Sequence, residues 1–134
     1  MPGFIRGGSL GRKLLIRVKD LMRTDNLPFI NEGASFTELL LCMSEGRLGM
    51  VIIGDKAHVK GIITDGDLRR ALLREPNTSK LTVTGMMTTS PVFIDETEFI
   101  SQAETLMMEK KITTVLVGSS ANRNISGIYQ IYNQ

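Results

Sequence analysis

Residues 61–72 read GIITDGDLRRAL, and the interpretation of the whole chain depends on this stretch. The apolar pair after Gly61 indicates the end of a strand and residues 64–67 a turn. Residues 68–74 indicate a helix that ends before Pro76. A helix that begins after such a turn directs free backbone N–H groups at it, and helix ends of this kind bind phosphate. The stretch therefore predicts a phosphate cradle between a strand and a helix.

Thr64 and Asp67 support two interpretations of this turn. Thr64 offers a hydroxyl donor, and the Asp67 carboxylate is able to accept from a ribose diol. The same T-x-x-D spacing is close to a capping box, in which Thr64 caps the helix and Asp67 bonds back to it. Because short motifs of this kind recur by chance, the stretch on its own favours the cap.

The composition excludes several classes of protein. The 134 residues are 42% hydrophobic and 22% charged with a net charge of +2, which is ordinary for a globular domain. The basic residues are scattered and Trp is absent, so we expect no nucleic-acid partner. Cys42 and His58 are the sole residues of their types, which leaves neither a disulfide framework nor a zinc set. The apolar runs are too short to span a bilayer and the start lacks a signal peptide, so we expect a cytoplasmic protein without a membrane partner.

An internal repeat organises the chain. Matching residues recur at a shift of 64 to 66 positions: Val18 with Val83, Met22 with Met87, Phe29 with Phe93, Met43 with Met107, Val51 with Val115 and Gly61 with Gly127. Each copy is typical of a strand, helix, strand, strand and helix in that order. Two copies, each too small to bury a good core alone, should pack face to face around a pseudo-two-fold axis with clefts between them.

The repeat divides the chain into three expected parts. Residues 1–14 are rich in glycine and are typical of a linker, residues 15–76 form the first copy, and residues 80–134 form the second. Within the first copy we expect a helix over residues 35–46. Ser35 and Glu38 would form its capping box, and Gly46 would terminate it.

The ordered set of features resembles a pair of cystathionine-β-synthase (CBS) domains over about residues 15–134. The shared features are V-x-x-x-M at the start of each copy, an apolar strand after the first helix, and G-[IV]-[IVF]-T-x-x-D before the last helix. The resemblance implies an α+β fold of two pseudo-two-fold-related β-α-β-β-α half-domains, the second lacking its last helix. It also implies an AMP- or ATP-type nucleotide as ligand, with no required cofactor, metal or catalytic residue.

The resemblance also implies which residues hold the nucleotide, and it reverses the preference for a simple cap. Thr64 and Asp67 would hold the phosphate and ribose. The walls of the site would be Ile62, the segment Met22, Arg23 and Thr24, and the segment Met50 and Val51. Arg70 is a candidate for the phosphate because Arg binds phosphate bidentately, and Thr114 is a candidate for a contact across the cleft.

The second copy departs from this pattern. Gln130 stands where Thr64 stands, Asn133 stands where Asp67 stands, and the sequence stops at Gln134 before the expected last helix. An amide accepts a hydrogen bond without contributing charge. We therefore expect at most one good nucleotide site.

Residues 4–15, FIRGGSLGRKLL, resemble the junction F-H-P-G-G-[SA]-L-G-R of sugar-phosphate isomerases of the arabinose 5-phosphate isomerase type. In that family a catalytic sugar-isomerase (SIS) domain precedes two CBS domains. The enzymes interconvert D-ribulose 5-phosphate and D-arabinose 5-phosphate, a precursor of the Kdo sugar of lipopolysaccharide or capsule. Ile5 and Arg6 replace the family's His-Pro, whose His belongs to the active site, and the SIS domain is missing. The resemblance implies a regulatory part, itself inactive, that forms a homodimer and whose parent enzyme is a tetramer.

Three hypotheses remain open from the sequence. The chain is a sensor of a nucleotide, or of a nucleotide-activated sugar end product, linked to a catalytic partner. It is alternatively a structural or oligomerising pair in which T-x-x-D only caps a helix. A third hypothesis, an enzyme in its own right that uses Asp65 and Asp67, lacks any accompanying nucleophile and base.

Overall fold

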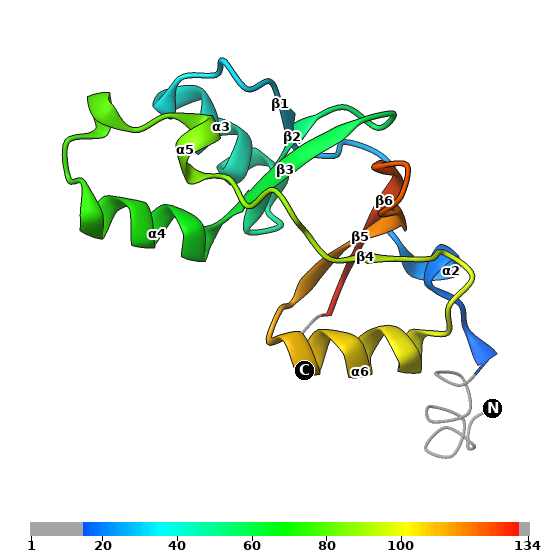
Figure 1. Ribbon diagram of the computed structural model, residues 1–134. Coiled ribbons are helices and arrows are strands. Elements are labelled where there is room, and N and C mark those ends of the chain that lie inside the picture. The colour runs from blue at the N-terminus through cyan, green and yellow to red at the C-terminus, as the bar shows by residue number, and fades with distance from the viewer. Residues whose placement is uncertain (1–14, 132–134) are drawn as a thin grey trace.

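Two three-stranded sheets carry the fold, and each is built by one copy of the repeat. The computed structural model describes residues 15–131. The first copy contributes α2 (Val18–Leu21), β1 (Phe29–Ile30), α3 (Phe36–Gly46), β2 (Met50–Gly54), β3 (Val59–Thr64) and α4 (Asp65–Arg74). A 3₁₀ turn (Thr78–Lys80) leads to α5 (Val83–Met86), β4 (Phe93–Ile94), α6 (Ile100–Lys110), β5 (Thr114–Ser119) and β6 (Asn124–Gln130). Figure 1 shows the two sheets, with α3 and α4 beside the first and α6 beside the second.

The registers of the two sheets confirm the repeat and the α+β class. The strand orders are β1-β2-β3 and β4-β5-β6, each with one parallel and one antiparallel pair. Met50 pairs with Thr64 in the first sheet, and Thr114 pairs with Gln130 in the second. Gln130 therefore occupies the position of Thr64, as the sequence predicts. Asn133 and the expected absence of a last helix lie outside the described residues.

Helix α3 has the predicted capping box and ends at Gly46, but the left-handed residue that caps its C-terminus is the next one, Arg47. The Glu38 amide donates to Ser35 Oγ over 3.1 Å, and the Ser35 amide donates to Glu38 Oε1 over 2.8 Å. The residue that leaves the helix is Arg47, with a left-handed φ of 58°. Gly46, predicted as the terminator, is the last helical residue. A Cβ there would lie 2.8 Å from that of Pro28, so the close approach of the two segments explains this glycine.

The leading segment of each copy packs against the other copy. Val18 of α2 lies in the core of the second half with Ile94, Ile100 and Val115. The backbone of Arg23 pairs with that of Ile128 in β6, with N···O distances of 2.8 and 2.9 Å. In Figure 1, α2 (blue) lies beside the second sheet although it comes first in the chain.

The leading segment of the second copy does the reverse. Val83 and Met86 of α5 lie in the core of the first half with Leu39. Thr88 pairs with Ile62 of β3 through two backbone hydrogen bonds of 2.8 and 3.0 Å. The strand edge of each half is therefore covered by the chain that leads into the other, which protects both edges from further pairing.

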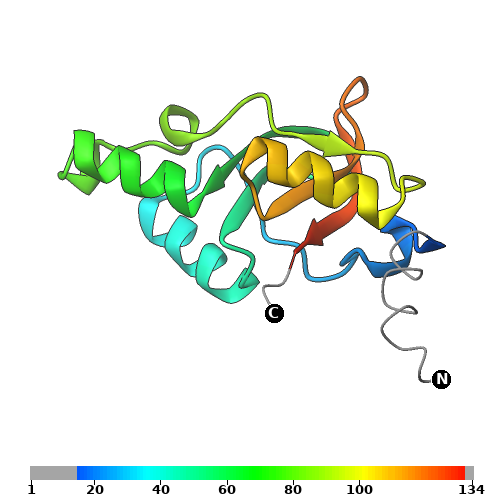
Figure 2. The same ribbon diagram turned by 90° about the horizontal axis from the view of Figure 1, so that it is seen from below.

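The side chains of β2 alternate between two cores, as the period of a strand requires. Val51 packs with Leu39 of α3 and Ala71 of α4. Met50 faces the other way and packs with Leu116 and Ile128 of the second half. Figure 2 shows the same ribbon from below, with α6 along the second sheet. Within residues 15–131, no helix is both long and apolar enough to cross a membrane.

Candidate ligand-binding cleft between the two halves

A cavity of about 470 Å³ opens between the two halves beside Thr64. This volume lies within the range of small-molecule sites. Its apolar surface comes from Leu48, Met50, Ile62, Val92, Ile112 and Leu116. Its polar surface includes Thr64, Asp65, Arg69, Thr88, Lys111 and Thr114. An apolar surface with a few polar groups at one side suits a flat ring that carries a polar or charged tail.

The turn at Thr64 is a complete capping box. Thr64 Oγ1 accepts from the Asp67 amide over 3.1 Å, and Asp67 Oδ2 accepts from the Thr64 amide over 3.0 Å. The Asp65 amide donates to the Gly49 carbonyl over 2.9 Å. The cap is thereby confirmed, and the predicted turn at residues 64–67 is in fact the first turn of α4. Gly66, which lines the cavity, keeps its amide without a partner among the described residues.

The Asp67 carboxylate already has several donors. Arg70 Nη2 donates to Oδ1 over 2.8 Å, and the Thr88 hydroxyl lies 3.2 Å from Oδ2. The Asp67 side chain is 13% exposed. Thr88 lines the cavity, whereas Asp67 and Arg70 lie outside its lining. A ligand hydroxyl at Asp67 Oδ2 therefore competes with the Thr88 hydroxyl, and one nitrogen of the Arg70 guanidinium is already bonded to Asp67.

Four residues singled out from the sequence meet at this cavity, namely Ile62, Thr64, Met50 and Thr114. Thr114 Oγ1 lies 3.4 Å from the Leu48 carbonyl and so joins the two halves at this point. Val51 is fully buried and its side chain belongs to the core beneath α3, because alternate residues of β2 face opposite ways. Contact of Ile62, Thr64, Met50 and Thr114 with a ligand stays a prediction.

The segment Met22, Arg23 and Thr24 does not line this cavity, so its predicted placement beside Thr64 is wrong. The physical reason is the exchange of leading segments, which pairs Arg23 with β6. The Arg23 guanidinium donates to the carbonyls of Asp25, Asn26 and Gly46 and so ties this loop to the end of α3. Thr88, the counterpart of Arg23 in the repeat, takes the predicted place.

Two cations of the cleft were not chosen from the sequence. Arg69 lies one turn beyond Asp65 on the same face of α4, a spacing that sequence reasoning is able to find. Lys111 follows α6 with φ of 58° and lines the cavity from the second half. The only sequence signal for Lys111 is its place in the repeat, since it is the counterpart of Arg47.

Cys42 and Tyr129 lie outside the lining of the cleft. Burial, with a smaller contribution from Glu45, raises the pKa of the Cys42 thiol, which disfavours the reactive thiolate. The Tyr129 hydroxyl donates to Glu104 Oε2 over 2.9 Å. Within residues 15–131, no group of three or more His, Cys, Asp or Glu residues is placed to hold a metal ion.

Two copies of one repeat, each with its leading segment packed in the core of the other, form a paired α+β module. The family model described as "CBS domain" matches residues 18–74 and 83–129, so this chain belongs to the CBS domain family. The chain is 46% identical over 120 residues to "Probable arabinose 5-phosphate isomerase" of Haemophilus influenzae, with 89% of this chain and 35% of that protein covered. It is 39% identical over 128 residues to "Arabinose 5-phosphate isomerase KpsF" of Escherichia coli, with 95% and 38% covered. The chain thus spans little more than a third of the length of these relatives.

Solved structures share the fold at low sequence identity. The CBS domain pair of protein MJ0100, in complex with 5'-methylthioadenosine and S-adenosyl-L-methionine, superposes with a TM-score of 0.72 at 23% identity, covering 85% of this chain and 88% of that one. CBSX2 in complex with AMP gives a TM-score of 0.69 at 21% identity, with coverages of 86% and 90%.

Proposed function

We propose that this chain is the nucleotide-sensing regulatory part of an arabinose 5-phosphate isomerase. The observation that carries the proposal is the cavity beside Thr64, which has an apolar surface and opens onto the first turn of α4. Both named CBS structures contain adenosine compounds, which supports a ligand of this class for the same fold. The relatives named above support the link to an isomerase.

An adenosine nucleotide has a consistent place in this cleft. The base packs against Ile62 and Met50, and the phosphate lies near the Gly66 amide at the positive end of α4. A ribose hydroxyl replaces the Thr88 hydroxyl at Asp67, which then keeps its bonds to Thr64 and Arg70. The capping role and the binding role of the T-x-x-D turn are therefore compatible.

The sensor acts on chemistry that lies elsewhere in the parent enzyme. The parent interconverts ribulose and arabinose 5-phosphates in the cytoplasm, on the route to Kdo for lipopolysaccharide or capsule, through an SIS domain joined to this pair. The chain itself is expected to show no turnover. A nucleotide-activated sugar, the end product of such a route, is the alternative ligand of the same cleft.

Replacement of Asp67 by Ala tests the binding role. The change removes a charged acceptor, so we expect the affinity for AMP or ATP to fall by about ten- to a hundred-fold, from a loss of about 1.5–3 kcal/mol. Calorimetric titration with AMP, ATP and a CMP-linked sugar acid measures the affinities, and thermal unfolding measures stability.

Glu38→Ala is the matched control, because Glu38 holds the same position in the capping box of α3 away from the cavity. Both variants should lose stability through the lost cap, and only Asp67→Ala should lose affinity. If none of the three compounds binds the unaltered chain, the pair is structural and the proposal fails. Unchanged affinity in Asp67→Ala would limit the turn to its capping role.

A further inference from the structure

Arg69 and Lys111 are cations that line the cleft from different halves of the molecule. Arg70 is paired with Asp67, and Arg23 is bonded to three carbonyls. The side chains of Arg69 and Lys111, in contrast, make no hydrogen bond or ion pair within the described part of the chain. Two unpaired cations that share one cavity favour an anionic ligand.

The charged side chains that line the cavity carry a net positive charge. Asp65 is the single acidic residue of the lining, so the side chains contribute a net charge of +1. The N-terminus of α4 adds the partial positive charge of a ten-residue helix. Three other hollows of the described chain lack a positive excess: Glu109 is the charged residue of one lining, Asp95 and Glu96 line the second, and Arg23 and Glu45 balance in the third.

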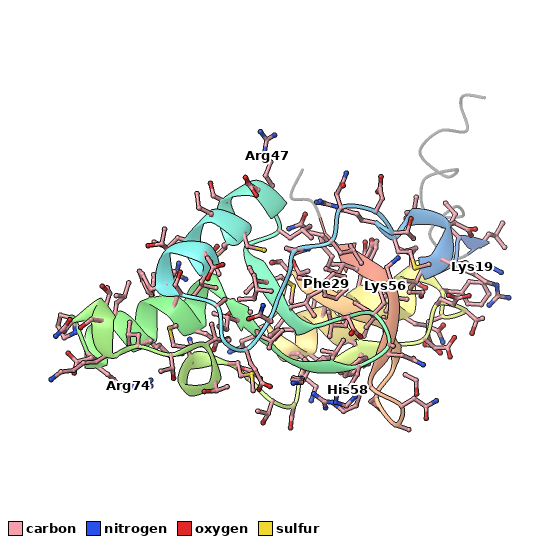
Figure 3. The ribbon with its side chains drawn as sticks, turned by 90° about the horizontal axis from the view of Figure 1, so that it is seen from above. Lys19, Phe29, Arg47, Lys56, His58 and Arg74 are labelled. Atoms are coloured by element: carbon pink, nitrogen blue, oxygen red, sulfur yellow. The ribbon has the colours of Figure 1, made fainter. Side chains whose placement is uncertain are left out.

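Lys111 differs from its counterpart Arg47 in where it lies relative to the cavity. Both residues follow a helix with φ of 58°, in the left-handed region where glycine is the unstrained residue. A cation after α6 also complements the negative end of that helix, but Lys110 already does so in the last turn. Arg47, the counterpart of Lys111, lies outside the cavity lining and extends into solvent in Figure 3.

We propose that Arg69 and Lys111 form a clamp that holds the phosphate groups of the cleft ligand between the two halves. The inference deepens the proposed function and rests on it for the identity of the ligand's apolar part. It specifies a phosphorylated ligand, with a chain of two or more phosphates favoured over a single phosphate and over a neutral nucleoside. Because one cation belongs to each half, such a ligand also ties the halves together.

Calorimetric titration with adenosine, AMP and ATP tests the clamp. In the unaltered chain, affinity should rise from adenosine to AMP to ATP and should weaken with added salt. Arg69→Gln and Lys111→Gln should each weaken ATP binding by about three- to tenfold and leave adenosine unchanged. Equal affinity for adenosine and ATP would overturn the proposal.

Matched controls separate the clamp from general charge. Lys110→Gln removes the neighbouring lysine of α6, and Arg74→Gln removes a cation at the far end of α4, where Figure 3 shows Arg74. Both should bind ATP as the unaltered chain does. Lys111→Gly removes the ammonium and relieves the left-handed backbone, so it should lose ATP affinity without a lower melting temperature. A lower melting temperature with full affinity would show a purely structural Lys111.

Titration with pyrophosphate tests the clamp independently of whether a nucleotide binds. In backbone NMR spectra it should shift the amides around Gly66 and Thr113 in the unaltered chain, and not in the Arg69→Gln/Lys111→Gln double variant. If AMP, ATP and adenosine all fail to bind while these shifts occur, the nucleotide proposal fails and the clamp stands. Absence of the shifts overturns the clamp even where nucleotides bind.

Discussion

Tyr129 occupies the position in β6 that Ile63 occupies in β3, and this exchange adds an ionisable group to the core of the second half. The ring is nearly buried, and its hydroxyl donates to Glu104. Burial raises the pKa of Tyr129 most, and the hydrogen bond and negative charge of Glu104 raise it further. The folded state therefore favours the neutral form of the Tyr129 phenol.

Tyr129→Phe should change how stability depends on pH. Because the folded chain holds the phenolic proton more tightly, the pair stabilises the fold below the ordinary pKa of 10.0 and loses this contribution as the pH rises above it. We expect urea unfolding between pH 7 and 11 to show a steeper loss above pH 10 in the unaltered chain than in the variant. At pH 7 the variant should be less stable by about 1–2 kcal/mol through the lost bond. Parallel curves for the two chains would contradict this assignment.

Residue types were easier to predict than their partners. The T-x-x-D spacing correctly identified Thr64 and Asp67 as a capping pair, because a capping box is a local interaction over three residues. The donation from Thr88 to Asp67 spans 21 residues and depends on the tertiary fold, so no local pattern indicates it. Lys111 was missed for the same reason.

Among the elements, the strands and the long helices follow from local sequence, and the exchange of α2 and α5 does not. The apolar pair after Gly61 correctly predicted the end of β3, and a capping box predicted α3. The leading helices are four residues each, too short for a helical period, and their partners are set by tertiary contacts, namely buried Val18 and Val83 and the backbone bridges at Arg23 and Thr88. For this reason the sequence predicted the segment from Met22 to Thr24 beside Thr64, whereas the structure pairs Arg23 with β6.

Paired truncations at α2 and α5 test the exchange. Val18→Ala and Val83→Ala each remove two buried carbons, which should cost about 2 kcal/mol. Amide hydrogen exchange should show lost protection first in β5 and β6 for Val18→Ala, and first in β2 and β3 for Val83→Ala. Each variant is the control of the other. Loss in the half that directly follows the altered residue in sequence would contradict the exchanged packing.

At the scale of the whole molecule, the two halves depend on each other. Leu48, Met50 and Leu116 belong to one apolar cluster that both sheets share. Arg123 adds polar contacts across the halves, with Nε donating to the Val59 carbonyl over 2.7 Å and Nη2 to the Lys60 carbonyl over 3.0 Å. Nη2 also donates to the carbonyl of Thr89, in its own copy, over 3.1 Å. Thr89 adjoins the segment that lines the cleft, so the side chain that joins the halves also helps to shape the site.

The outer faces of the helices remain apolar at several points. Leu41 of α3 and Leu73 of α4 are 57% and 84% exposed. Small modules gain buried apolar area by pairing, and an isologous dimer presents the same patch from both partners. We therefore predict that the chain forms a homodimer at millimolar concentration through a surface that includes these leucines.

The dimer is tested by placing charges on that surface. Leu41→Glu combined with Leu73→Glu should shift light scattering from the mass of a dimer to that of a monomer, because burying two carboxylates without partners opposes pairing. The fold should lose little stability, since both side chains are exposed. Gln102→Glu combined with Thr105→Glu adds the same charge at exposed polar positions of α6, in the other half of the molecule, and is the control that should stay dimeric. A monomer for the unaltered chain at millimolar concentration would refute the dimer, and a dimer that persists in the leucine variant would place the interface elsewhere.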